Sequence, residues 1–328
     1  MKLFIFLTVT IFLNNCSFDN KSGIWKNKSF SNNENNQFKN FKNLAFEKNV
    51  FNKVINLQKD FKFKSTRLVL NNDWKDVYYN NNNNFPNFKY NGLNEIIFRS
   101  KKLSSLETDN LFLFINDHVI ISDRKGNLII QSITGNKRYT KYNFYKKKHK
   151  KINKYLNLVA ENNIIYVSDN IGYLYAFDYK KEKVVWAKDY NVPFRSNLKI
   201  FKNKLITSNI NNELIYIDKN SGNTLRKIPT EETTLKNQFI NNIAQIKDLT
   251  LYLNTYGSLY SIDSESMRIN WLINLNQSLD LSPRNLFFGN QIVSKNNKIV
   301  VSSNKTTYVI DKNSGKIIFQ KNFSSFLK

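Results

Sequence analysis

The fold is decided by residues 165–186, which read IYVSDNIGYLYAFDYKKEKVVW. An apolar run leads into a polar turn from Asp169 to Gly172, where Asn and Gly tolerate the positive φ that a tight hairpin turn requires. A second apolar run follows, Asp178 begins another turn, and a third run ends at Trp186. Short runs rich in β-branched and aromatic residues, separated by such turns, predict consecutive antiparallel strands.

This pattern recurs along the chain, which indicates a repeat protein. The other copies are a degenerate one at 121–128 and fuller ones at 205–222, 253–271 and 301–316. The aspartate of the second turn recurs as Asp178, Asp218, Asp263 and Asp311, at intervals of 40, 45 and 48 residues. With an apolar strand before each copy, the unit has four strands, and four strands in roughly 40 to 45 residues is the period of a propeller blade. We therefore predict an all-β propeller of about five four-stranded blades over residues 65–328.

The residues that recur once per blade have a structural explanation. A catalytic site needs one constellation, whereas a residue repeated in every blade answers a need of every blade. We therefore expect Asp178, Asp218, Asp263 and Asp311 to stabilise turns. Trp186 and Trp271 occupy equivalent places and are expected to pack between blades.

The N-terminus resembles a lipoprotein signal. Lys2 precedes the apolar run 3–13 (LFIFLTVTIFL), which is too short to span about 30 Å of hydrocarbon and is typical of a signal peptide. The run ends shortly before Cys16, the only cysteine of the chain, as in a bacterial lipobox. Residues 1–16 are thus predicted to be the signal with lipidation at Cys16. Asn15 departs from the small residue that lipoboxes prefer, and a plain secretory signal stays the alternative.

The chain is strongly basic. The chain of 328 residues has 50 Lys and Arg against 25 Asp and Glu, a net charge of +25. No nucleic-acid-binding pattern accompanies it, so we expect no nucleic acid partner. The basic run Lys146–Lys151 is predicted to be a solvated loop, with anion binding as the alternative. Residues 17–64 are polar and without a steady period and are predicted to form a tether, and 79–84 a low-complexity loop.

Two sets of residues carry a family resemblance. Residues 169–186 resemble the quinoprotein-like (PQQ-like) propeller repeat, and DKNSG at 218–222 and DKNSGK at 311–316 match its second turn. The combination of lipobox, tether and repeats resembles the BamB family of lipoproteins, which assist the assembly of outer-membrane β-barrels. The opening CSFDNKSGIW at 16–25 is similar to the start of some mature members.

This resemblance implies eight blades, whereas about five units are found before Lys328. We therefore expect an array that is incomplete toward the C-terminus, either because the sequence is a fragment or because another chain closes the ring.

The resemblance also implies partners and contact loops. The barrel subunit, a BamA-like protein, is the expected partner, with unfolded outer-membrane proteins as a second class. The corresponding contact residues are Leu235 and Lys236 in one loop, and Asp280 and Arg284 in another. Ordinary loops between blades are the alternative. Ser17 rather than Asp after the cysteine favours the outer membrane, on its periplasmic face.

An enzymatic function is not expected. Quinoprotein dehydrogenases share this repeat and resemble one another in an adjacent Cys pair, which a chain with one cysteine lacks. His118 and His149 have no zinc-binding spacing around them. No catalytic residue, cofactor or metal is therefore predicted, and the expected function is a scaffold that binds proteins through propeller loops. A quinoprotein-like enzyme and a generic adhesion or ligand-binding propeller stay open as alternatives.

Overall fold

The computed structural model describes residues 68, 73–89, 92, 94–96, 98–109, 111–134, 139–145, 148–232, 240–276, 286–303 and 306–323, with the backbone of 16–18 and 25–27. The chain divides into two compact units, Met1–Lys64 and Ser65–Lys328, and each is described by itself. In the first unit, β1 (Cys16–Phe18) pairs antiparallel with β2 (Trp25–Asn27). Within the described residues, no helix is long and apolar enough to cross a membrane.

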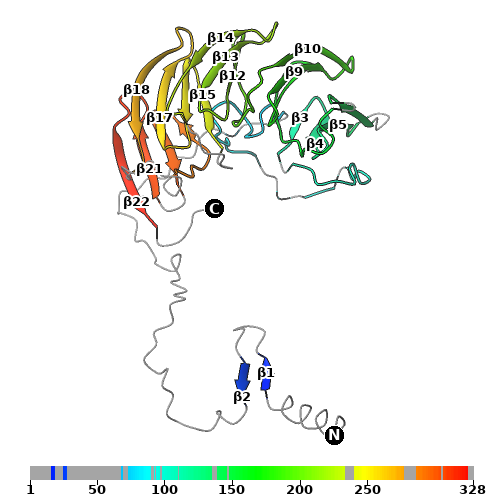
Figure 1. Ribbon diagram of the computed structural model, residues 1–328, viewed down its shortest axis with the longest axis horizontal. Helices are drawn as coiled ribbons and strands as arrows, with labels where there is room; N and C mark the ends of the chain where they lie inside the picture. The colour runs from blue at the N-terminus through cyan, green and yellow to red at the C-terminus, as the bar shows by residue number, and fades with distance from the viewer. Residues whose placement is uncertain are drawn as a thin grey trace, which may run out of the picture. The chain divides into compact units, whose positions relative to one another are not determined.

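The second unit contains five four-stranded antiparallel sheets, each built from consecutive strands. The first blade comprises β3 (Leu113–Ile115), β4 (His118–Ser122), β5 (Asn127–Ser132) and β6 (Tyr139–Asn143). The second comprises β7 (Leu156–Glu161), β8 (Ile164–Asp169), β9 (Tyr173–Asp178) and β10 (Lys183–Asp189). The third comprises β11 (Lys199–Phe201), β12 (Lys204–Ser208), β13 (Leu214–Asp218) and β14 (Thr224–Ile228). The fourth comprises β15 (Asn242–Ile246), β16 (Leu249–Leu253), β17 (Ser258–Asp263) and β18 (Arg268–Asn274). The fifth comprises β19 (Val293–Lys295), β20 (Lys298–Ser302), β21 (Thr306–Asp311) and β22 (Ile317–Asn322). The predicted all-β architecture with about five blades is confirmed (Figure 1).

The repeated aspartates lie at one position, the last residue of the third strand in blades two to five, as predicted. Each carboxylate accepts hydrogen bonds from its own turn. In Asp218, Oδ1 accepts from the backbone N–H of Asn220 and Ser221 and from the Ser221 hydroxyl, at 3.1, 2.8 and 2.8 Å. Asp311 makes the same three contacts with Asn313 and Ser314. The aspartates therefore stabilise the turn between the third and fourth strands.

The core of the molecule lies between blades rather than within them. The second and third strands of blades two to four are almost wholly buried, because each has a neighbouring sheet on both faces. Four buried apolar clusters join the first blade to the second, the second to the third, the third to the fourth and the fourth to the fifth.

Two tryptophans on fourth strands connect adjacent blades, as predicted. The Trp186 indole N–H donates to the carbonyl of Lys219 in the next blade, at 3.0 Å, and Trp271 donates to Lys312 at 3.0 Å. A Cβ atom on Gly222 would come within 2.7 Å of the Trp186 ring. That glycine has a φ of +69°, so it both forms the turn and admits the tryptophan of the preceding blade.

Residues 74–84 run across the first strand of each of the five blades, which we call the inner strand. The backbone of Trp74 pairs with Phe114 of the first blade, and Lys75 accepts from Ala160 of the second at 2.8 Å. The stretch 79–84, predicted to be a low-complexity loop, is a loop, and it packs against the first strands of the blades. The Asn81 carbonyl accepts from Gln245 at 2.7 Å, and Asn83 is 3% exposed.

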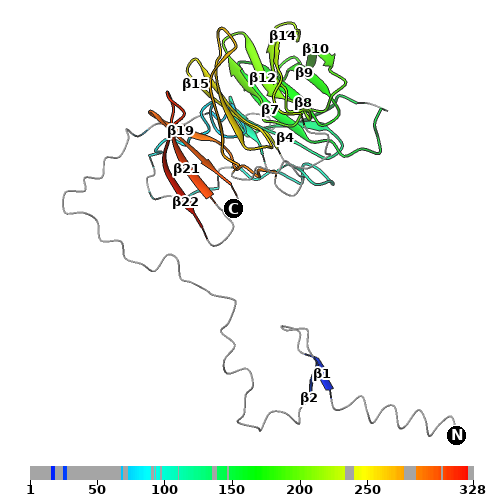
Figure 2. The ribbon, with the colours of Figure 1, turned by 60° about the vertical axis from the view of Figure 1, so that its left-hand side comes forward.

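The five blades follow one another in chain order along an arc (Figures 1 and 2). Successive side chains of a strand point to opposite faces of its sheet. Along β20 and β21, buried residues alternate with more exposed ones, so one face of the fifth blade is covered and its outward face is exposed. In the described part of the chain, no buried apolar cluster joins the fifth blade to the first.

Candidate functional site

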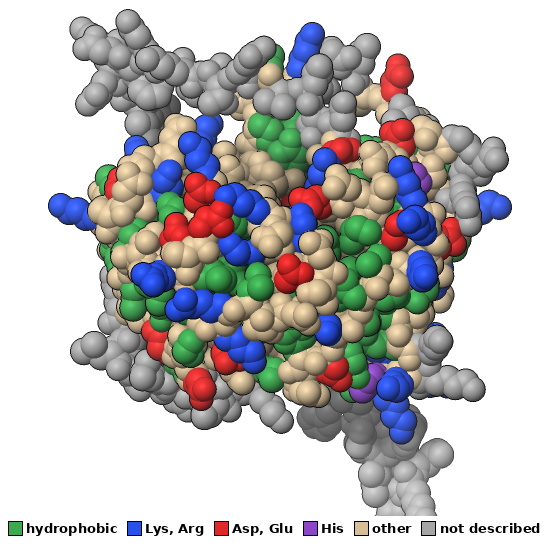
Figure 3. All heavy atoms as spheres, turned by 90° about the horizontal axis from the view of Figure 1, so that it is seen from above, with side chains coloured by type: hydrophobic (Ala, Val, Ile, Leu, Met, Phe, Trp, Pro, Cys, Tyr) green, Lys and Arg blue, Asp and Glu red, His purple; other side chains and the backbone are tan. Residues whose placement is uncertain are grey.

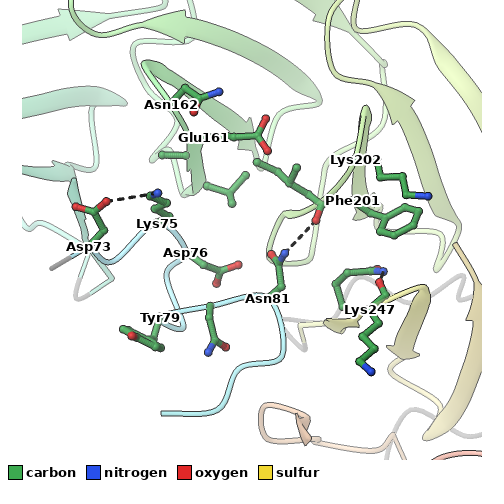
Figure 4. Close-up of a pocket in the computed structure, with 15 residues that line it drawn as sticks. Asp73, Lys75, Asp76, Tyr79, Asn81, Glu161, Asn162, Phe201, Lys202 and Lys247 are labelled. Carbon is green, nitrogen blue, oxygen red and sulfur yellow. Dashed lines mark hydrogen bonds and ion pairs between the residues drawn. The ribbon is translucent and has the colours of Figure 1, made fainter. Parts of the chain in front are cut away.

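A cavity of about 870 Å³ opens where residues 73–84, here named the axial segment, meet the first strands and hairpin turns of blades two to four (Figure 4). The axial segment contributes Asp73, Lys75, Asp76 and the stretch Tyr79–Asn81. The first strands of blades two to four and the turns that follow them contribute the rest, including Glu161, Lys202 and Lys247. These turns are tight, with φ values of +54° at Asn162, +52° at Lys202 and +50° at Lys247. The wall of the cavity combines side chains of both charges with apolar ones such as Ile200 and Phe201.

A buried ion pair lies beneath this cavity. Lys199 of β11 has no exposed surface, and its Nζ lies 2.7 Å from Oδ2 of Asp76, which is 2% exposed. The same ammonium donates to the Asn80 carbonyl at 3.1 Å and to the Asn83 side-chain oxygen. The other Asp76 oxygen accepts from the backbone N–H of Tyr78 at 2.9 Å. The lysine thus has three acceptors on the axial segment, which it holds against the third blade.

Burial acts on both members of this pair. Loss of hydration raises the pKa of Asp76 and lowers that of Lys199, and the opposite charge of each partner offsets the shift of the other. The hydrogen bonds of both groups are made to each other and to the axial segment. Their role is to fix the axial segment.

The remaining charges of the cavity are mostly paired. Lys75 lies 3.4 Å from Asp73, and Lys202 forms an ion pair with Glu265. Elsewhere on the surface, Figure 3 shows a face on which Lys and Arg side chains are interspersed with Asp and Glu, with hydrophobic side chains between them. Among the described residues, no group of three His, Cys, Asp or Glu side chains could hold a metal ion. The cavity is therefore lined by charged side chains that are largely bonded to other residues of the chain.

The opposite end of the blades carries a second feature, the connection between β14 and β15. Glu231 begins this connection and accepts hydrogen bonds from Ser258 at 2.6 Å, Tyr260 at 2.8 Å and Asn254 at 2.6 Å. Burial opposes its ionisation, but these donors outweigh burial and hold the pKa of Glu231 below its ordinary value. The carbonyl of Glu232 accepts from the Tyr256 hydroxyl at 3.1 Å. The base of the connection is therefore fixed to the fourth blade.

The fold can be compared with solved structures at this point. BamB from Moraxella catarrhalis is similar with a TM-score of 0.54 and 15% identity, over 67% of this chain and 65% of BamB. A quinohemoprotein alcohol dehydrogenase from Pseudomonas putida is similar with a TM-score of 0.57 and 11% identity, over 76% of this chain and 48% of the enzyme. The fold is that of the PQQ-like β-propellers. Sqt1 from Saccharomyces cerevisiae is also similar, with a TM-score of 0.52 and 13% identity over 65% of this chain and 60% of Sqt1.

These similarities establish the PQQ-like propeller fold alone, because all the identities lie far below those of close relatives. The chain spans just under two thirds of the length of BamB and about half that of the dehydrogenase. No protein-family model matches the sequence, and no curated protein matches it either.

The predicted contact residues of the propeller fall outside the described residues. Leu235 and Lys236 lie in the connection between β14 and β15, and Asp280 and Arg284 lie in that between β18 and β19. Both connections leave a fourth strand and enter the next first strand, so topology starts and ends them at the same end of the blades. The roles of these four residues stay predictions.

Sequence reasoning missed the best-defined residues of both ends of the propeller, Lys199 and Glu231. A signal for Lys199 existed, because the aligned position in blades two, four and five holds Val159, Ala244 and Val293. A lysine at an inner-strand position that is otherwise apolar indicates a buried partner. Glu231 carried no comparable signal, since a glutamate in a connection is ordinarily solvated.

Part of the basic run is described, and it borders an aromatic pocket. Lys148 and His149 line a cavity of about 490 Å³ with Phe144, Tyr173 and Tyr175. The Phe144 and Tyr175 rings stack at 4.3 Å between centroids. Lys148, Lys150 and Lys151 are exposed in a turn, as expected of a solvated loop, whereas His149 is half-buried beside Tyr173.

Proposed function

We propose that this propeller is a non-catalytic scaffold subunit in the assembly of outer-membrane β-barrel proteins, held at the periplasmic face of the outer membrane by a lipid on Cys16. One observation carries the proposal: the polar side chains that recur in the blades, and those of the axial segment, bind other groups of this chain. The turn aspartates bind their own turns, and Lys199 and Asp76 bind each other. What differs between blades is the length and sequence of the connections, which is where a scaffold recognises its partners.

The connection between β14 and β15 supports this proposal. Its beginning is fixed by Glu231, so the residues that follow start from a rigid base. Leu235 offers an apolar side chain and Lys236 a cationic one, a pairing that suits a partner with an apolar pocket beside an acidic group. The fold likeness to BamB favours a BamA-like barrel subunit as that partner, with unfolded outer-membrane proteins as the second class.

The test is copurification of the membrane-extracted protein with the barrel subunit of its own cells. The double substitution Leu235→Asp with Lys236→Glu should lower recovery of that subunit about a hundredfold, since loss of two good contacts amounts to roughly 3 kcal/mol. Leu225→Asp is the matched control, because Leu225 is a 44% exposed leucine on β14 of the same blade.

Unchanged recovery with the double variant would remove these loop residues from the interface. Absence of any barrel subunit in the wild-type preparation would overturn the assembly function itself.

The second candidate is a quinoprotein-like enzyme, favoured by the fold likeness to the quinohemoprotein alcohol dehydrogenase. The residues present do not fit a quinone site well. The chain has a single cysteine in its whole sequence, and its own residues 74–84 occupy part of the region between the described blades. Dye-linked oxidation of an alcohol after addition of the quinone and Ca²⁺ would favour the enzyme over the scaffold.

A further inference from the structure

Each blade presents one face to the blade that follows it. Four side chains, one from each strand and at equivalent positions in every blade, form a row across that face. Strand register aligns the row directly, because residues opposite each other on neighbouring strands lie on the same face. In the second blade the row is Val159, Tyr166, Ala176 and Trp186. In the fourth blade it is Ala244, Leu251, Ser261 and Trp271.

In the second and fourth blades this row forms the inter-blade core. The fourth-blade row packs against Ile299, Val301 and Ile310 of the fifth blade, and Trp271 completes the contact by donating to Lys312. The row is therefore the surface by which a blade receives the next sheet.

The fifth blade has the same row, and it is entirely hydrophobic. It consists of Val293, Val300, Val309 and Phe319, with Phe319 at the position of Trp271. Val300 is 36% exposed and Phe319 is 51% exposed. The opposite face of the same sheet is covered, since Ile299, Val301 and Ile310 have no exposed surface. The fifth blade is thus built to receive a sheet that the described residues do not supply.

The first blade cannot supply that sheet from a second copy of this chain. Its outer face is covered in part by residues 98–103: the Tyr139 hydroxyl donates to the Leu103 carbonyl at 2.9 Å, and Gln131 beside it is 6% exposed. A second copy added head to tail would therefore meet this segment instead of a free blade face.

Charge argues against two copies meeting by their fifth blades. Lys295, Lys298 and Lys321 flank the apolar row and are exposed, while Asp311 beside them is engaged by its own turn. Face-to-face pairing would bring like charges together, in chains of net charge +25.

We propose that the outward face of the fifth blade docks a β-sheet of another protein, which lies on it as a further blade. The partner sheet presents an apolar row with a small residue opposite Phe319, as Gly315 lies opposite Trp271, and acidic residues toward Lys298 and Lys321. This proposal uses strand residues of the fifth blade, whereas the proposed scaffold function uses residues of the connections, so it does not depend on that function.

The experiment places a photoreactive phenylalanine analogue at position 319 of the full chain in its own cells. Irradiation should give an adduct with another protein, and mass spectrometry should place the attachment in a β-strand of that protein with acidic residues beside it. The same analogue at position 272 is the matched control, because Leu272 is 53% exposed on β18, but on the face of the fourth blade turned away from the fifth.

Two variants test the chemistry of the contact. Val309→Asp places a charge in the apolar row, and Lys298→Glu with Lys321→Glu reverses the flanking charge without touching the core. Each should lower the yield of the adduct by about tenfold or more, which is roughly 1.4 kcal/mol of binding. The second variant changes only exposed residues and guards against a folding defect in the first.

Adducts formed only within the chain or between two copies of it would overturn the proposal, as would an adduct that the charge reversal leaves unchanged. Leu235→Asp should leave the adduct at 319 intact, so failure of this proposal and failure of the scaffold function are distinguishable.

Discussion

At the scale of single residues, Lys199 departs most clearly from the repeat. The repeat places a hydrophobic residue here, and the third blade places a fully buried ammonium. Burying an unpaired charge is costly, so the lysine is tolerated only because Asp76, Asn80 and Asn83 come to it from more than a hundred residues earlier. The presence of a lysine at this buried position is therefore explained by its contacts with the axial segment, and not by contacts within its own blade.

Breaking this pair should strongly destabilise the protein. Lys199→Met leaves Asp76 buried without its partner, and we expect the free energy of unfolding to fall by about 3 to 5 kcal/mol. Replacing both, as Lys199→Met with Asp76→Leu, should cost less than Lys199→Met alone, because no uncompensated charge stays behind. Urea denaturation of the two variants checks this difference.

Lys202→Met is the control for that comparison, since Lys202 lies on the neighbouring turn and its side chain is 59% exposed. It should change the free energy of unfolding by no more than about 0.5 kcal/mol. A double variant as unstable as Lys199→Met alone would contradict the pairing argument.

At the scale of the elements, the blade hairpins depend on side chains that bind their own turns. Asx-type contacts recur at a second place in each of blades one to four: the Asp169 carboxylate accepts from Ile171, Gly172 and Tyr173, and Asn254 accepts from Tyr256 and Ser258. Since Asp and Asn form such turns locally, the hairpins are encoded within a few residues.

These turns predict a pH dependence. Hydrogen bonds from Ser221 and Ser266 hold the pKa of Asp218 and of Asp263 below its ordinary value, and the turn around Ser314 does the same for Asp311. A depressed pKa means that the unfolded chain binds protons first as the pH falls. The stabilisation is thus present above pH about 4, the unfolded value, and is lost as the pH falls through the folded values.

Replacing all three aspartates by Asn should therefore flatten the decrease in stability between pH 5 and pH 3, measured by thermal unfolding across that range. Asp117→Asn, in a turn of the first blade outside this motif, is the control for a change in charge. A slope equal to that of the wild type would show that these carboxylates do not contribute.

At the scale of the whole molecule, the axial segment joins blades that are otherwise linked only to their neighbours. The Asn83 amide donates to the carbonyls of Ile243 in the fourth blade and Ile292 before the fifth, at 3.1 and 2.9 Å. Repeat arrays ordinarily gain their stability from adjacent interfaces. Here one short segment adds contacts across the array.

Asn83→Ala should loosen the fourth and fifth blades, which the Asn83 amide connects, and it also removes one of the three acceptors of Lys199 in the third blade. Each buried carbonyl left without its donor costs about 1 to 3 kcal/mol. Hydrogen exchange measured by mass spectrometry should therefore accelerate in β15 and β19 while β7 and β8 change little. Asn84→Ala, one residue further along, is the control. Equal acceleration in all blades, or none, would count against a connecting role for Asn83.

The sequence by itself determined the blade. Four strands, the turn aspartates and the inter-blade tryptophans all follow from contacts within one repeat or between consecutive repeats, and such contacts have a period that can be read along the chain. The predicted positions of Asp178, Asp218, Asp263 and Asp311 were confirmed for that reason.

Only the tertiary structure decided where the molecule is distinctive. The run of asparagines at 79–84 was predicted only as a low-complexity loop, because polarity alone does not tell a solvated amide from one bonded to buried carbonyls. The pairing of Asp76 with Lys199 and the open row ending at Phe319 likewise depend on which blades meet in space. Whether a side chain is buried depends on the residues packed around it. When those residues are far apart in the chain, their contacts produce no periodic pattern in the sequence.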